Sequence, residues 1–73
     1  MATELNAPMV GKIVELLVKP GDQVEEDEPV LVLEALKMKM TLVAPCDGTL
    51  REFRVGEADD VESDAVLAII DED

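Results

Sequence analysis

The sequence predicts an all-β fold in which two half-sheets close against each other about a pseudo-twofold axis. Two observations carry this prediction: the apolar segments are short and rich in branched residues, and the chain contains an internal repeat. Many short strands separated by turn residues are typical of sandwiches and barrels. Few stretches remain that could form a full helix.

Each apolar segment is bounded by residues that favour turns, mainly Gly, Pro, Asn and Asp. These turn residues separate most of the predicted strands from one another. The segments that predict strands are 13–18, 30–33, 42–43 and 66–70, and the turns between them are 8–11, 19–22, 28–29 and 45–48.

The internal repeat appears when the chain is aligned with itself at an offset of 37 residues, which lays residues 3–34 over residues 40–71 without a gap. Ten of the 32 aligned pairs are identical, whereas average residue usage gives about two by chance. Two repeats are too few for a solenoid. We therefore expect one domain over residues 1–73, whose halves 3–34 and 40–71 pack face to face.

The repeat also predicts the core, because each half must supply equivalent side chains to a shared interior. Gly11 and Gly48 are expected to mark bends or places of close backbone approach. The residues expected to face inward are Ile13, Leu16, Val18, Val24, Val30 and Leu33 in the first half, and Leu50, Phe53, Val55, Val61, Leu67 and Ile70 in the second.

The junction between the halves is residues 35–39, which follow the closing strand 29–34 and precede the opening strand 40–43. A connector of five residues between strands forms a hairpin. Its central residue, Lys37, is therefore expected to project into solvent.

The charge balance favours protein partners over nucleic acid. Eighteen acidic and six basic residues give a formal net charge of -12, which repels nucleic acid and anionic membranes. For any single acidic residue, simple solubility is an equally good explanation. No apolar run approaches a membrane span and residues 1–8 do not look like a signal peptide, so we expect a soluble, cytoplasmic protein.

Residue types needed for most catalytic and metal sites are scarce. Histidine is absent and Cys46 is the only cysteine, so no zinc cluster or internal disulfide is expected, and Cys46 is expected to be a partly buried filler. Residues 60–64 space carboxylates like a calcium loop, but Ala65 stands where that loop needs glycine. A solvated turn explains residues 60–64 and 25–28 better, and a free-standing enzyme is the least favoured class.

Residues 32–38, with the sequence VLEALKM, and the Ala44-Pro45 pair downstream resemble the attachment segment of biotinyl domains, the biotin carboxyl carrier family. The likeness continues through residues 18–24 and their copy 55–61, and covers nearly the whole chain. It implies a flattened β-barrel, a barrel-sandwich hybrid of two four-stranded antiparallel sheets, with a modified lysine on a hairpin turn.

The resemblance implies that Lys37 carries covalent biotin, and that Glu34, Ala35, Leu36 and Met38 form the recognition motif around it. The family places its lysine between two methionines, whereas Leu36 precedes it here. In the family these flanking residues matter more for carboxyl transfer than for attachment, so Leu36 bears on transfer efficiency. Leucine and methionine are close in volume, and the exchange is usually mild.

A second lysine competes for this assignment, because Met38-Lys39-Met40 matches a bare Met-Lys-Met motif. The register favours Lys37, which follows Glu34-Ala35 by one intervening residue and stands at the centre of the connector. Lys39 is expected at the start of the next strand.

The resemblance further implies a carrier with no catalytic residues of its own and no metal. A biotin protein ligase would attach biotin from biotinyl-adenylate, a biotin carboxylase subunit would carboxylate it, and a carboxyltransferase subunit would take the carboxyl group. The alternatives are a lipoyl carrier domain of a 2-oxoacid dehydrogenase-type complex, whose lysine usually follows aspartate and precedes alanine, and an unmodified protein-binding module of the same fold. A lysine that merely aids solubility at a hairpin tip is the simplest alternative for Lys37.

Overall fold

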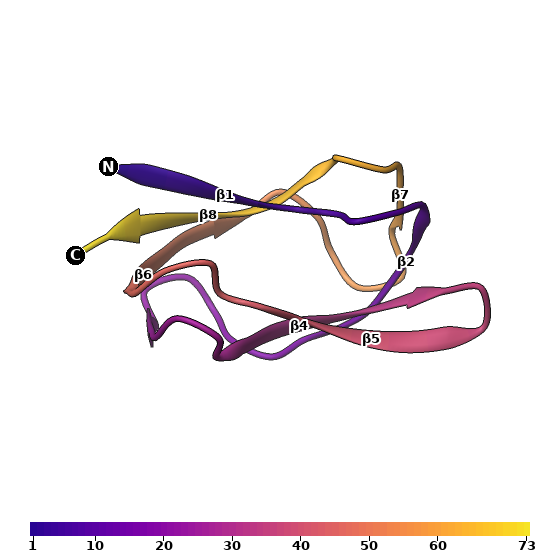
Figure 1. Ribbon diagram of the computed structural model, residues 1–73, viewed down its shortest axis with the longest axis horizontal. Coiled ribbons are helices and arrows are strands. Elements are labelled where there is room, and N and C mark those ends of the chain that lie inside the picture. Colours follow the sequence, from indigo (N-terminus) through magenta and orange to yellow (C-terminus); the bar gives the residue numbers. More distant parts are fainter.

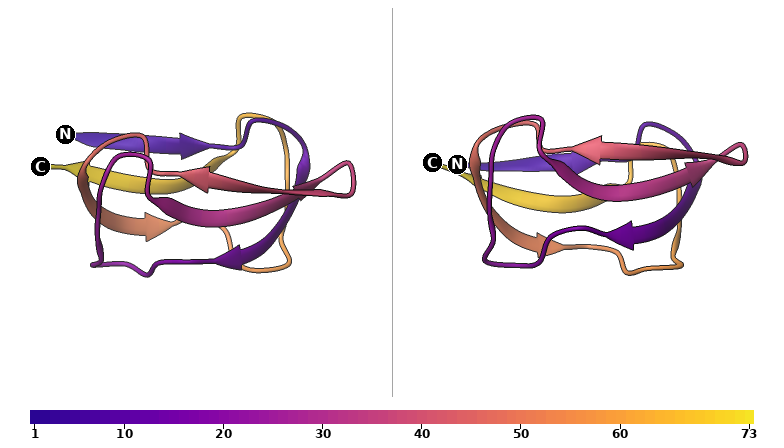
Figure 2. Two further views of the ribbon diagram at one scale, coloured as in Figure 1. Left: turned by 60° about the horizontal axis from the view of Figure 1, so that its bottom comes forward. Right: turned by 90° about the horizontal axis from the view of Figure 1, so that it is seen from below.

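The computed structural model describes residues 1–73 and contains eight strands and no helix. The strands form two four-stranded sheets with the orders β1-β8-β6-β3 and β5-β4-β2-β7, and every pair is antiparallel. The sheets enclose a flattened barrel (Figures 1 and 2), so the predicted fold class is confirmed. The strands are β1 (Ala2–Asn6), β2 (Gly11–Leu16), β3 (Gln23–Val24), β4 (Pro29–Ala35), β5 (Met38–Val43), β6 (Gly48–Phe53), β7 (Asp60–Val61) and β8 (Val66–Glu72).

The 37-residue offset of the sequence repeat also relates the strands of the two sheets. The bounds of β2, β3 and β4 become those of β6, β7 and β8 when 37 is added to each residue number. The irregularity between Ile13 and Glu15 in β2 likewise recurs between Leu50 and Glu52 in β6. The molecule therefore has pseudo-twofold symmetry, and below we call two residues 37 positions apart counterparts.

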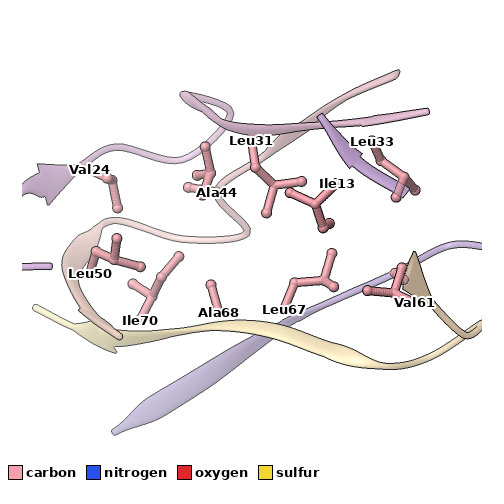
Figure 3. Close-up of a cluster of buried hydrophobic side chains, with 12 residues drawn as sticks. Ile13, Val24, Leu31, Leu33, Ala44, Leu50, Val61, Leu67, Ala68 and Ile70 are labelled. Atoms are coloured by element: carbon pink, nitrogen blue, oxygen red, sulfur yellow. The ribbon is translucent and has the colours of Figure 1, made fainter. Parts of the chain in front are cut away.

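A single cluster of apolar side chains fills the space between the sheets (Figure 3). Four of the twelve predicted core residues are only partly buried and pack on its margin, because they are the last residues of β2 and β6 or lie beyond them: Leu16, Val18, Phe53 and Val55. The eight that are buried, as predicted, are Ile13, Val24, Val30, Leu33, Leu50, Val61, Leu67 and Ile70.

Two counterpart glycines mark close contacts between neighbouring strands, as the repeat predicted. A Cβ atom on Gly11 would lie 2.5 Å from the carbonyl oxygen of Glu34 in β4, and one on Gly48 would lie closer still to that of Asp71 in β8. Glycine at these two positions therefore lets each sheet keep its strand spacing. The contact between Gly11 and Glu34 lies near the end of β4, where the chain approaches β5.

Candidate functional site

The β4–β5 hairpin closes with a two-residue turn made of Leu36 and Lys37. The strands are paired up to Ala35 and Met38, so the expected five-residue connector over 35–39 is wrong. Both turn residues have positive φ, 53° for Leu36 and 66° for Lys37, as a type I′ hairpin turn requires. The ladder reaches the turn because each further strand pair satisfies backbone groups that would otherwise be left to solvent.

Lys37 is in the turn of this hairpin, and the hairpin reaches the end of the molecule opposite the two chain termini (Figure 1). The Lys37 side chain is exposed, and it takes part in neither of the two ion pairs in the structure, Arg51–Asp71 and Arg54–Glu52. Its amine is therefore accessible to solvent and has no ion-pair partner.

The residues of the predicted motif are brought together on the same hairpin. Glu34 is exposed, while Ala35 is buried and anchors the end of β4. Leu36 and Met38 are both exposed, although they are large apolar side chains. The tip therefore presents an amine between two apolar groups.

Lys39 occupies a different backbone environment from Lys37. It lies within β5 and pairs with Glu34 of β4, which in turn pairs with Lys12 of β2. Its side chain is exposed, but its backbone is held in the ladder. Of these two lysines, only Lys37 lies in the turn.

The structure offers no other chemical site that competes with the hairpin. It has no pocket, and no group of three or more acidic, cysteine or histidine side chains is placed to hold a metal ion. Part of the acidic segment 60–64 forms β7, and Cys46 is partly buried against the core. No helix has the length and hydrophobicity needed to cross a membrane.

The ion pair between Arg51 and Asp71 shifts the pKa values of both side chains, and it lies away from the hairpin. Arg51 in β6 donates side-chain hydrogen bonds to Asp71 in β8. These hydrogen bonds lower the pKa of the Asp71 carboxyl below its ordinary value and raise the pKa of Arg51. This pair contributes to the surface of the other sheet and not to the chemistry of Lys37.

Residues 3–70 match the model of the family described as "Biotin-requiring enzyme". The chain belongs to this family. It is 50% identical over 54 residues to the biotin carboxyl carrier protein of acetyl-CoA carboxylase from Solanum lycopersicum, covering 71% of this chain and 77% of that protein. It is also 39% identical over 66 residues to the mitochondrial methylcrotonoyl-CoA carboxylase subunit alpha of Oryza sativa subsp. japonica, covering 90% of this chain but 9% of that protein.

Solved structures of the family's fold are similar over almost the whole chain. The urea carboxylase of Kluyveromyces lactis superposes with a TM-score of 0.91 and 27% identity, over 96% of this chain and 6% of that chain. The lipoyl domain of the 2-oxoglutarate dehydrogenase complex from Azotobacter vinelandii superposes with a TM-score of 0.82 and 29% identity, over 94% and 95%. One backbone thus serves both a carboxylase and a lipoyl domain, so the fold alone does not determine the cofactor.

Proposed function

We propose that this chain is a biotin carboxyl carrier domain with biotin joined to Lys37 through an amide, and that it acts without catalytic residues of its own. The observation that carries the proposal is the placement of Lys37 in an exposed two-residue turn with no ion-pair partner. An enzyme that acylates a folded protein needs an amine that can enter its active site, and a hairpin tip supplies one.

Attachment requires Lys37 to act as a nucleophile. Its amine attacks the acyl carbon of biotinyl-adenylate, the new C–N bond forms, the C–O bond of the mixed anhydride breaks and AMP leaves. The proton lost by the amine passes to a base of the ligase, since no histidine exists in this chain. When bound, biotin supplies a ring nitrogen that accepts a carboxyl group and later releases it.

The contribution of the chain itself is to position and tether. The paired strands hold the tip rigid relative to the barrel, so the arm starts from a defined point on the surface. A tether of this kind raises the effective concentration of the carried group to the ~mM range at any site that the arm can reach.

The residues beside Lys37 favour biotin over lipoate. Leu36 and Met38 flank the lysine, whereas lipoyl domains usually have aspartate before it and alanine after it. The relative with 50% identity is a biotin carboxyl carrier protein, which agrees with this choice.

We further propose three protein partners: a biotin protein ligase, a biotin carboxylase subunit and a carboxyltransferase subunit. The net charge of -12 favours partners whose docking surfaces are basic. Such complementarity mainly speeds association, and its effect weakens as the salt concentration rises.

The test is co-expression of the full chain with a biotin protein ligase or, separately, with a lipoyl ligase, followed by intact-mass measurement. We expect the mass increment of one biotinyl group with the first enzyme and no lipoyl increment with the second. Lys37→Arg should abolish the increment, and the matched control Lys39→Arg should retain it. An unshifted mass in the presence of the biotin ligase, or a lipoyl increment alone, would contradict the proposal.

A further inference from the structure

Three large apolar side chains are strongly exposed at the end of the molecule that carries Lys37. Leu36 is 84% exposed, Met38 is 68% exposed and Val10, in the turn between β1 and β2, is 61% exposed. Val10 is distant in sequence from the attachment motif, yet the β1–β2 turn lies at the hairpin end (Figures 1 and 2). We call Val10, Leu36 and Met38 the apolar collar.

The strand register explains why Val10 lies near the hairpin. β2 and β4 pair Lys12 with Glu34 and Ile13 with Leu33, so the residues just before β2 lie at the end of β4 that leads into the hairpin. The counterparts of Val10 and Leu36, Asp47 and Asp73, are joined by a backbone hydrogen bond of 3.4 Å from Asp73 N to Asp47 O. No equivalent bond joins Val10 and Leu36, because Leu36 lies in the hairpin turn with positive φ, so these two residues share an end of the barrel but do not form a strand pair.

The pseudo-symmetry allows each collar residue to be compared with its counterpart in the other half of the chain. At the opposite end of the barrel, the counterpart of Val10 is Asp47 and the counterpart of Leu36 is Asp73. The backbone at the position of Val10 thus accepts a charged side chain in the other half, whereas the counterpart of Met38 is Met1, which is also apolar and exposed. The fold therefore does not require an apolar residue at the position of Val10, and exposed apolar groups that cluster around a functional residue mark an interaction site.

The shape and charge of this end indicate what binds there. The structure has no pocket, so the collar does not line a ligand cavity. A binding partner must supply the concave surface. Glu62 and Asp64 follow β7 at this end, and Asp64 N donates a hydrogen bond of 2.9 Å to the carbonyl oxygen of Ala7 beside the β1–β2 turn. The complementary partner is therefore a protein cavity with apolar walls, whose rim is basic where it meets Glu62 and Asp64 and acidic where it meets Lys12 and Lys39.

We infer that the apolar collar docks into the mouth of the partner active site that carboxylates the loaded arm, and that acylation of Lys37 switches this docking on. The inference rests on the proposed function. It assigns a role to Val10, which lies outside the attachment motif, and it makes the loaded and unloaded domains different ligands for the same partner.

The switch follows from the charge of Lys37. Before loading, the collar surrounds an ammonium group, and moving that charge into an apolar mouth loses its hydration without providing a counter-ion. Acylation converts the amine into a neutral amide, so the same burial no longer carries this penalty. The unloaded domain therefore does not compete with the loaded domain for the carboxylating site.

The first test compares Val10→Asp with the matched control Val43→Asp in the full chain. Val43 is 38% exposed at the far end of β5, and its counterpart is the polar Asn6, so both positions tolerate a polar side chain in this fold. Both variants are loaded by the biotin ligase and then used as substrates of a biotin carboxylase with MgATP and bicarbonate. We expect Val10→Asp to raise KM about tenfold, which is equivalent to about 1.4 kcal/mol, and Val43→Asp to change it less than twofold.

Loading is measured by intact mass in the same samples, which separates the two hypotheses. Failure of the wild-type chain to load would refute the proposed function. Normal loading of both variants with equal KM values would leave that function standing and refute the role of Val10.

The second test isolates the charge of Lys37. Lys37→Gln and Lys37→Arg both lack the acylated amine, but the first has a neutral tip and the second a charged one. Each is added as a competitor to the carboxylation of the loaded wild-type domain. We expect Lys37→Gln to inhibit at a concentration about tenfold lower than Lys37→Arg, and equal inhibition by the two would refute the switch.

Discussion

Replacing Gly48 with alanine tests whether the close strand contacts of the barrel are as tight as the structure shows. The added Cβ would overlap the carbonyl oxygen of Asp71 in β8 and would also lie 2.9 Å from the Cγ2 atom of Ile70. The first of these atoms belongs to the backbone of a paired strand. It can move away only if the β6–β8 ladder shifts.

The expected cost follows from two opposing effects. Overpacking a buried site costs about 1–3 kcal/mol, while the loss of backbone freedom in the unfolded chain returns about 0.4–1 kcal/mol. We therefore expect Gly48→Ala to lower the free energy of unfolding by about 1–2 kcal/mol and Tm by roughly 5–15 °C. A chain of 73 residues has a total stability of only about 4–11 kcal/mol, so this loss is easily measured.

The assay is urea unfolding followed by circular dichroism, with Gly56→Ala as the matched control. The nearest atom to a Cβ on Gly56 is Asp59 Oδ2 at 3.8 Å, and the backbone there does not have positive φ. Gly56→Ala should be neutral or stabilise the domain by up to about 1 kcal/mol. Equal stabilities for the two variants would refute the close approach of Gly48 to β8.

Three further variants probe the turn, the core and the ion pair. Leu36→Asn places a residue that tolerates positive φ in the turn and should raise the free energy of unfolding by about 1 kcal/mol in urea titration; a decrease would contradict the turn geometry. Leu33→Ala removes a fully buried side chain and should lower the same quantity by about 3 kcal/mol, and a loss below about 1 kcal/mol would contradict its place in the core. Arg51→Gln removes the partner that lowers the pKa of Asp71. The stability from Asp71 is present above its unfolded pKa of about 3.9 and is lost as pH falls through the lower folded pKa, so this variant should flatten that part of the acid-unfolding curve; an unchanged curve would count against the pair.

The overall fold could be predicted because the repeat constrains two distant halves at once. A single run such as 30–33 fits several folds, but the same pattern of strands, turns and glycines at a fixed offset requires two equivalent sheets. The alignment of Gly11 with Gly48 in the repeat was informative for the same reason, since a Cβ atom at either position would meet the backbone carbonyl of a neighbouring strand.

Burial in β4 was harder to predict than its location. Val30, Leu31 and Leu33 are all buried, which breaks the alternation expected of a strand between core and solvent. The cause is an irregularity in the β4–β5 ladder between Pro29 and Leu31. Leu31 lies two residues before Leu33, so alternation alone places it in the core, and the repeat-based prediction omits it together with its counterpart Ala68.

The length of the hairpin turn could not be predicted from the sequence either. Two-residue turns with positive φ are usually signalled by Asn-Gly or Asp-Gly, whereas Leu36 and Lys37 are both poor residues for that conformation. The candidate lysine was nevertheless located correctly in the turn, since the junction of the repeats centres on it. Local strain at a functional position is a common reason for such a conflict between sequence and structure.

Val10 was not identified as a candidate residue from the sequence, although a signal was present. In the repeat, Val10 aligns with Asp47, so an apolar residue occupies a position that is acidic in the other half. Only ten of the 32 aligned pairs are identical, so such a mismatch becomes informative only when the position is exposed beside a candidate functional residue. Val10 meets this condition, because it is exposed at the end of the molecule that carries Lys37.

The account depends most on the claim that the turn between the two halves offers its lysine, and no other amine, for acylation. Tandem mass spectrometry of proteolytic peptides from the ligase-treated wild-type chain tests this claim directly, because it locates the acyl group on a single residue. We predict that the biotinyl group is found on Lys37 alone. Its detection on Lys39, or on a mixture of the lysines, would contradict the assignment.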